Sequence, residues 1–356
     1  MRIAILGAGN GGQSTAARCG RAGHSVRLYD RFPEVVEPLA SLGEIRTGGA
    51  VEEAGPIELA TTDMSRAVSG ADLILVSVPG FAHRYIASEL AGVLHGDETV
   101  VLHPGGFGGA LEVRKTWSDL GVPAGVRLAE TNTLAYACRV VEPGTVHIGG
   151  VKRAFSVAAL GASRTPEVVQ ALRPVFPNVE AANSVLETSF DNMNPVAHPV
   201  VAVLNAGPMD GGDFDFYADG LTPSVVRAME ALDAERMEVA GELGIPFRSH
   251  PAWLERSYGI VGSDTMDTER QLASNVMRGI GVPGGMHGRY VTEDVPLGLV
   301  PMTCMARLAG VHTPVIDAVI TLAGAATGRD YRGEGRSLED MGIDNLTPEQ
   351  ILEAIA

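Results

Sequence analysis

The sequence predicts an α/β protein in which a doubly wound parallel sheet is followed by a mainly α-helical second domain. Three observations support this prediction: a glycine-rich turn directly after the first strand, an alternation of short apolar runs with helical stretches, and the loss of the strand pattern from about Ser184. At roughly 150 residues per domain, a chain of 356 residues should form two domains. We place them at residues 1–183 and 184–356.

The composition is that of an ordinary globular protein and excludes several classes of partner. Hydrophobic residues make up 45% of the chain and charged residues 20%. The net charge is −16, and a surface this acidic repels nucleic acid and anionic lipid. The chain has no run of 18 apolar residues and no secretory signal, so we expect a cytoplasmic protein without a membrane partner. Its three cysteines and nine histidines show no paired spacing, so neither disulfides nor a metal site are expected.

The first thirty residues contain a complete dinucleotide-binding pattern of the Rossmann type. A strand at 2–6 leads into GAGNGG at 7–12, a helix follows, and a second strand at 25–29 ends at Asp30. In this pattern Gly7 permits the tight turn, Gly9 lets the backbone approach a pyrophosphate, and Gly12 allows close helix packing. The expected cofactor ligands in the loop are Gly7, Gly9, Asn10, Gly11 and Gly12.

Asp30 and Arg31 bear on which dinucleotide is bound. The Asp30 carboxylate would accept hydrogen bonds from both ribose hydroxyls and repel a 2′-phosphate, so it favours NAD. Arg31 could bind that phosphate, which keeps NADP as an alternative. A glycine turn that binds nothing is the other interpretation, but the flanking strands, the helix and the acidic residue favour a cofactor site.

The remainder of the first domain continues the alternation of strands and helices. Strands are expected at 73–78, 99–103 and 126–129 and within 146–160, with helices at 82–94 and 109–120. Three loops follow strands and are candidates for ligand contacts: 78–80 with Pro79, 103–106 with His103, and 130–133 with Thr133. We expect the first to border the adenosine and the second the nicotinamide, while an ordinary turn remains the alternative for each.

The most informative stretch of the second half is Asn194–Asn205. Asn194 could cap a helix that begins at Pro195, and His198 and Asn205 would then share its face. A histidine and two amides on a stripe otherwise made of Val, Ala and Leu need polar partners if they are buried. We therefore expect His198 to be catalytic and the two asparagines to bind substrate, although a core histidine bonded to a carbonyl is the alternative. Other helices are expected at 223–243 and 299–309, and Thr347 with Gln350 forms a capping box at the tail.

A second polar cluster lies at Arg289–Asp294, just before an apolar run. The Arg289 guanidinium is suited to a substrate carboxylate, and a carboxylate beside His198 would fix its tautomer. A surface loop with a solvated ion pair is the alternative interpretation.

The chain resembles the opine dehydrogenases, the octopine/nopaline dehydrogenase family, over essentially its whole length. The resemblance rests on GAGNGG at 7–12, HPGGFGGALEVRK at 103–115, ETNTLAYACR at 130–139, NPVAHPVVAVLNA at 194–206, GLTPSV at 220–225, LDAER at 232–236, RYVTEDVPLGLVP at 289–301 and TPVIDAV at 313–319. It implies that His198 is the catalytic histidine, Asp294 its carboxylate partner and Arg289 the arginine that holds a keto-acid carboxylate. Cys138 falls near the contacts expected for an amino donor.

The resemblance also implies the reaction. The family joins the amino group of an amino acid to a 2-keto acid, here expected to be pyruvate, while NAD(P)H reduces the imine. The expected partners are thus small molecules, and apolar helical surface leaves a homodimer open. Two alternatives remain: a 2-keto acid or ketopantoate-type reductase, and an NAD(H)-binding sensor without catalysis. The usual base of the reductases is a lysine, and the only lysines here, Lys115 and Lys152, both fall in the first domain.

Overall fold

The computed structural model describes residues 1–277 and 284–356, which divide into two compact units. The first, called the sheet unit below, contains residues 1–105, 109–188 and 355–356. The second, called the helical unit, contains residues 106–108 and 189–354. Every strand among the described residues belongs to the sheet unit.

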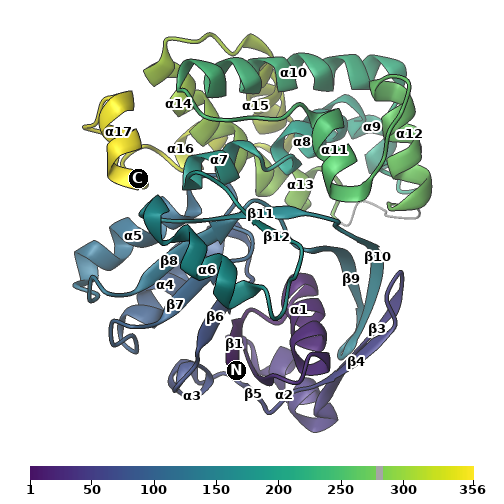
Figure 1. Cartoon of the computed structure of the whole chain (residues 1–356). Helices are drawn as coiled ribbons and strands as arrows, with labels where there is room; N and C mark the ends of the chain where they lie inside the picture. Colours follow the sequence, from purple (N-terminus) through teal and green to yellow (C-terminus); the bar gives the residue numbers. More distant parts are fainter. Residues whose placement is uncertain (278–283) are drawn as a thin grey trace. The chain divides into compact units, whose positions relative to one another are not determined.

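The larger sheet of the sheet unit has eight strands (Figure 1). Their order is β12 (Val179–Ala181), β11 (Phe155–Ala159), β8 (Arg127–Thr131), β7 (Thr99–Leu102), β6 (Leu73–Val76), β1 (Arg2–Leu6), β2 (Ser25–Tyr29) and β5 (Leu59–Thr61). Neighbours are parallel except β8 and β11, which are antiparallel. The predicted doubly wound sheet is confirmed, and the strands predicted at 2–6 and 25–29 have the same bounds in the structure.

Helices connect these strands, and those predicted after the glycine turn and at 82–94 and 109–120 are confirmed. They are α1 (Asn10–Arg21), α2 (Pro33–Leu42), α3 (Met64–Val68), α4 (His83–Ala91), α5 (Gly109–Leu120) and α6 (Thr165–Leu172), and α7 (Val185–Phe190) begins in the sheet unit and ends in the helical unit. Strands β6 and β7 are buried along their whole length, which explains why they read as continuous apolar runs.

A second sheet, which the sequence analysis did not predict, covers the other side of α1. Its order is β4 (Glu53–Pro56), β3 (Glu44–Gly49), β10 (Thr145–Val151) and β9 (Tyr136–Glu142). Helix α1 packs against β1 and β2 of the larger sheet and against β4 and β9 of the smaller one (Figure 1). Gly20 makes this approach possible, because a Cβ there would overlap the main chain of β4 at Pro56.

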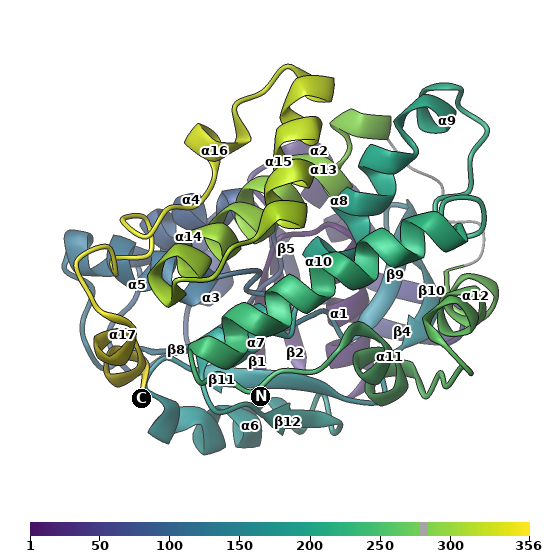
Figure 2. The same cartoon turned by 90° about the horizontal axis from the view of Figure 1, so that it is seen from above.

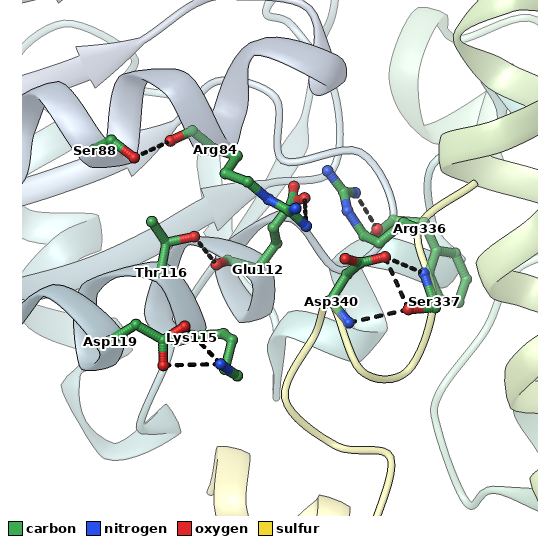
Figure 3. Close-up of polar contacts among 10 residues, drawn as sticks. Arg84, Ser88, Glu112, Lys115, Thr116, Asp119, Arg336, Ser337 and Asp340 are labelled. Atoms are coloured by element: carbon green, nitrogen blue, oxygen red, sulfur yellow. Dashed lines mark hydrogen bonds and ion pairs between the residues drawn. The ribbon is translucent and has the colours of Figure 1, made fainter. Parts of the chain in front are cut away.

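Side-chain contacts join helices α4 and α5. Arg84 Nη2 lies 3.1 Å from Glu112 Oε1, and the indole N–H of Trp117 donates to the carbonyl oxygen of Ala87 at 3.0 Å. Figure 3 shows the Arg84–Glu112 pair and, further along α5, the ion pair between Lys115 and Asp119. These contacts hold the helix that follows the 103–106 loop.

The helical unit is built around α8. Its helices are α8 (Asn194–Leu204), α9 (Ala206–Asp210), α10 (Pro223–Glu242), α11 (His250–Tyr258), α12 (Thr265–Asn275), α13 (Arg289–Thr292), α14 (Val300–Ala309), α15 (Pro314–Thr327) and α16 (Tyr331–Glu334). Helix α8 contacts α10, α13 and α15 (Figure 2). The predicted mainly helical second half, including helices near 223–243 and 299–309, is confirmed.

The tail ends in α17 (Pro348–Ile355), which begins with the predicted capping box. Thr347 Oγ1 accepts from the Gln350 N–H, and Gln350 Oε1 accepts from the Thr347 N–H at 2.9 Å. Before it, the Asp340 carboxylate accepts from the N–H and the hydroxyl of Ser337 (Figure 3). No helix in the described ranges has the length and hydropathy needed to cross a membrane.

Candidate active site

The glycine loop between β1 and α1 has the geometry that a bound pyrophosphate requires. Gly7 has a φ of 105°, a conformation that favours glycine. A Cβ at Gly12 would overlap the carbonyl oxygen of Gly7, whereas a Cβ at Gly9 would have no atom within 4 Å. Gly12 is therefore needed for packing, and Gly9 presents open space. The loop fits a phosphate group next to the first N–H groups of α1.

Asp30 lies at the end of β2 and is bonded to the glycine loop itself. Its Oδ2 accepts from the Ala8 N–H at 2.9 Å, and Oδ1 accepts from the Phe32 N–H at 3.2 Å. Each carboxylate oxygen keeps a lone pair for a ribose hydroxyl. The exposed Arg31 guanidinium lies 4.7 Å from the Phe32 ring and 5.2 Å from that of Tyr85. The position of the Asp30 carboxylate fits the ribose of NAD. The Arg31 guanidinium is exposed and is accessible to a 2′-phosphate.

Asn10 and Cys138 connect the smaller sheet to the start of α1. Asn10 Oδ1 accepts from the Val140 N–H at 2.8 Å, and Cys138 Sγ lies 3.4 Å from both Ser14 Oγ and the Asn10 carbonyl oxygen. Burial raises the pKa of Cys138, although the Ser14 hydroxyl opposes this. The thiol therefore stays protonated and lies against α1, beside the predicted cofactor loop. Gln13, which the sequence analysis missed, holds the same loop by donating to the Ala8 carbonyl oxygen at 2.8 Å.

The loops that carry the predicted residues Pro79 and Thr133 approach the glycine turn through neighbouring residues: a Cβ at Gly7 would overlap the carbonyl oxygen of Ser77. Pro79 precedes a short turn at Gly80–Ala82 after β6. Thr133 is buried in the loop after β8, and its carbonyl oxygen accepts from the Thr131 hydroxyl at 3.0 Å. The next residue, Leu134, reaches the loop: a Cβ at Gly11 would lie 2.9 Å from its Cδ2.

His103 is held in the interior of the sheet unit. Its Nδ1 lies 2.8 Å from Thr131 Oγ1, and its Nε2 accepts from the Ala135 N–H at 3.5 Å. Burial and the nearby Lys152 lower the pKa of His103 to about 3. The imidazole is therefore neutral, and its bonds hold the loop after β8. It is a core histidine.

His198 and Asp294 are brought together in the helical unit although 96 residues separate them. His198 Nδ1 lies 2.8 Å from Asp294 Oδ2, and the two side chains are 12% and 13% exposed. Helix α8 carries the histidine, and Asp294 follows α13, which packs against α8. Burial raises the pKa of Asp294, while the bond to His198 opposes this. Since Nδ1 is bonded to the carboxylate, Nε2 is the ring nitrogen that faces away from Asp294.

Two tyrosines that the sequence analysis missed complete the surroundings of His198. Tyr217 Oη lies 3.0 Å from His198 Nε2. The ring of Tyr290 stacks on the imidazole, with 4.0 Å between centroids and 28° between planes. Tyr290 adjoins Arg289 in the sequence, which is a signal that could have found it. Tyr217 belongs to an irregular loop, and no periodicity marks it.

Arg289 begins α13 and lies at the surface. Its side chain is 61% exposed, and Nε donates to Glu293 Oε2 at 2.5 Å. Burial lowers the pKa of Arg289, but the carboxylates of Glu293 and Asp294 more than offset this and raise it. The guanidinium is thus a permanent cation a few residues from the histidine's carboxylate partner, where a substrate anion could displace Glu293.

The predicted cap role of Asn194 is wrong, and Asn205 bonds to the main chain. Asn194 does not cap α8; it is the first helical residue and is exposed. The reason is that Asn192 Oδ1 accepts from the Asn194 N–H at 3.2 Å and so satisfies the start of the helix. Asn205 is buried and donates to the carbonyl oxygens of Val201 at 2.8 Å and Gly220 at 3.1 Å. Its amide N–H groups hold the end of α8 to the loop that carries Tyr217.

Comparisons with known proteins match the two halves of the chain to two different family models. Residues 181–327 match the family model "NAD/NADP octopine/nopaline dehydrogenase, alpha-helical domain", and residues 2–118 match "NAD-dependent glycerol-3-phosphate dehydrogenase N-terminus". The opine dehydrogenase of Arthrobacter sp. (strain 1C) is 36% identical over 360 residues, which cover 99% of this chain and 98% of that relative. The chain belongs to the opine dehydrogenase family. This family member is an NAD(P)-dependent oxidoreductase.

Solved structures show that the opine dehydrogenase fold extends over the whole chain. A structure of octopine dehydrogenase in complex with NADH and agmatine has a TM-score of 0.79 at 23% identity and covers 99% of this chain and 98% of its own. Another, with NADH and pyruvate, has a TM-score of 0.77 at 22% identity and the same coverage.

Proposed function

We propose that this opine dehydrogenase condenses the amino group of an L-amino acid with a 2-keto acid, with pyruvate as the expected keto acid, and reduces the imine to an N-(1-carboxyalkyl) amino acid. The same site would catalyse the reverse oxidation. The observation that carries the proposal is the bonded pair of His198 and Asp294, because loss of water from a carbinolamine needs a proton donor. The octopine dehydrogenase structures contain NADH with an amine, agmatine, or with pyruvate, which supports both substrate classes.

The residues predicted for the catalytic and substrate site have the following roles in this proposal. Arg289 binds the carboxylate of the keto acid. His198 is the acid that provides the proton for loss of the carbinolamine oxygen, and Asp294 holds the imidazole tautomer and stabilises the charged ring. Bound NAD(P)H would supply the hydride. The exposed Asn194 is proposed to contact substrate at the start of α8, and substrate contacts by Asn205, Thr133 and Cys138 stay predictions from the sequence.

The sheet unit is proposed to hold the cofactor. Its proposed ligands are Gly7, Gly9, Asn10, Gly11, Gly12, Asp30, Arg31 and Pro79. Asp30 favours NAD, and Arg31 keeps NADP as the alternative. We take residues 1–183 as the dinucleotide-binding domain and residues 184–356 as the catalytic domain. A cytoplasmic location and a homodimer stay predictions from the sequence.

The experiment that tests the function measures oxidation of NADH, with NADPH in parallel, in the presence of pyruvate, with and without a pool of amino acids. We expect oxidation that needs pyruvate and an amine together, and splitting the pool would then identify the amino donor. Oxidation with pyruvate alone would contradict the proposal and favour a 2-keto acid reductase.

His198→Ala is the matched control of that experiment. General acid–base catalysis contributes typically about 10²- to 10⁴-fold in rate, so kcat should fall by roughly this factor. The affinity for NADH should stay unchanged, because His198 belongs to the helical unit and the proposed cofactor ligands to the sheet unit. Loss of NADH binding in this variant would show that the histidine is structural.

A further inference from the structure

Both ring nitrogens of His198 are bonded to protein groups in this structure. Asp294 Oδ2 lies 2.8 Å from Nδ1, and Tyr217 Oη lies 3.0 Å from Nε2. Tyr290 covers one face of the ring at 4.0 Å, and Phe216 approaches it edge-on with centroids 6.0 Å apart. A proton that leaves Nε2 therefore meets the hydroxyl of Tyr217 first.

The position of Tyr217 is set by its own loop. Asp215 Oδ1 accepts from the backbone N–H groups of Tyr217 at 3.1 Å and of Ala218 at 2.9 Å. Asp219 Oδ2 in turn accepts from the Asp215 N–H at 2.8 Å. At the end of the loop, the Gly220 carbonyl oxygen accepts from the Asn205 amide. The hydroxyl is thus preorganised against the imidazole by the fold of residues 215–220.

The protonation state of Tyr217 suits a proton relay. Burial, then the neighbouring Tyr290 with its side-chain hydrogen bond to Tyr217, and then Tyr258 and Glu269, raise the pKa of Tyr217 well above its usual value. The side chain consequently stays a neutral phenol. A phenol has one donor and an acceptor oxygen. It can accept a proton from the charged imidazole while it donates its own to another oxygen.

We propose that Tyr217 relays the proton between His198 and the substrate oxygen, an inference that rests on the proposed condensation. In the dehydration step the Tyr217 hydroxyl proton goes to the carbinolamine oxygen, and the Nε2 proton of the imidazolium goes to Tyr217 Oη. The C–O bond breaks and water leaves, while the lone pair of the amine nitrogen forms the C=N bond. His198 ends neutral, the iminium carries the positive charge, and Asp294 remains a carboxylate.

Tyr217→Phe tests the relay, because it removes the hydroxyl and keeps the ring. We expect kcat to fall by about 10²-fold, at the lower end of general acid–base effects. The thermal midpoint, the affinity for NADH and the KM for pyruvate should stay close to those of the wild type. Tyr331→Phe is the matched control, since Tyr331 is a fully buried tyrosine of α16 in the same unit, and its kcat should not change.

Two results would overturn the relay. A kcat of Tyr217→Phe equal to or above that of the wild type would mean that substrate meets Nε2 directly and that Tyr217 only covers it. The second readout uses the wild type alone and is independent of the folding of any variant: kcat/KM in mixtures of H₂O and D₂O. A bowed dependence, as two protons moving in one step produce, supports the relay, and a linear dependence contradicts it.

The same assays separate failure of the relay from failure of the proposed function. If the wild type oxidises NADH with the keto acid alone, the condensation is wrong. The kcat of Tyr217→Phe then still decides the relay, because His198 would have to protonate the carbonyl oxygen by the same route.

Discussion

At the scale of single residues, the side chains of His198 and Arg289 differ in solvent exposure. His198 and Asp294 are nearly buried, so separating them would leave an uncompensated group in a low dielectric. The Arg289 side chain is 61% exposed, and an exposed ion pair such as that with Glu293 contributes at most about 1 kcal/mol. Arg289 can therefore exchange Glu293 for a substrate carboxylate at little cost, whereas His198 is fixed in place.

Arg289→Ala should accordingly affect binding of the keto acid more than the chemical step. Hydrogen bonds to charged groups contribute about 1.5–3 kcal/mol, so the KM for pyruvate should rise by about 10- to 100-fold. Steady-state kinetics at saturating NADH and amino acid measures this. Arg332→Ala is the control, because Arg332 forms an exposed ion pair with Asp317 in the same unit. An unchanged KM in Arg289→Ala would remove the arginine from the substrate site.

Sequence reasoning found these residues by their polarity but could not find all of their partners. His198 is conspicuous because it interrupts an apolar helix. The pattern offered Glu293 and Asp294 before an apolar run, and the family resemblance selected Asp294. Tyr217 is placed by two aspartates that fold an irregular loop, and only the folded backbone reveals this. Asn205 was predicted on the same helical stripe as His198. The pattern could not show that the Gly220 carbonyl oxygen would take up its amide.

At the scale of elements, the glycine loop and α1 were predictable and the smaller sheet was not. The loop has a fixed local chemistry, and each glycine of the pattern has its own steric reason. The smaller sheet joins segments about 100 residues apart, and β3 and β4 contain glycine or proline in place of an alternating pattern. Strands β3 and β4 are too short and irregular to leave a local periodicity, and the pairing of β3 with β10 is long-range.

Gly9 and Gly12 provide a matched pair of substitutions in this loop. Gly9 has φ −79° and open space around its Cβ direction, so Gly9→Ala should fold normally and bind NADH more weakly, because the methyl group would occupy the space proposed for the pyrophosphate. Gly12→Ala should also destabilise the protein, by about 1–3 kcal/mol, since its Cβ overlaps the Gly7 carbonyl oxygen.

Calorimetric binding of NADH and thermal unfolding distinguish the two glycine variants. If Gly9→Ala binds NADH as tightly as the wild type, the pyrophosphate does not approach this position. If Gly12→Ala unfolds at the wild-type temperature, the turn is more adaptable than its geometry indicates.

At the scale of the whole molecule, the net charge of −16 is carried largely at the surface, while the helical unit also contains charged side chains that are buried in pairs. Arg236 is fully buried; its Nε donates to Asp233 Oδ1 at 2.8 Å, and its Nη1 donates to the Phe190 carbonyl oxygen. On the neighbouring helices, His250 Nδ1 of α11 lies 2.9 Å from Glu269 Oε1 of α12, with both side chains at most 5% exposed. The stability of this unit is therefore tied to the charge on one imidazole.

The free energy of unfolding should therefore depend on pH through the charge on His250. Burial lowers the pKa of His250, and so, to a smaller extent, does the charge of Arg236. The carboxylates of Glu269 and, more weakly, of Asp233 raise it by more, so the folded-state pKa is raised. A raised histidine pKa stabilises the fold fully below about pH 6.5, the unfolded value, and this contribution is lost as the pH rises through the folded-state pKa.

Breaking a buried pair costs roughly 3–5 kcal/mol, so His250→Gln should lower the free energy of unfolding by up to this amount at pH 6 and by less at alkaline pH. Thermal unfolding between pH 6 and 9 measures the difference, with the exposed His312→Gln as control. Parallel curves for His250→Gln and the wild type would mean that the imidazole is neutral in the folded protein and that Glu269 is held by other groups.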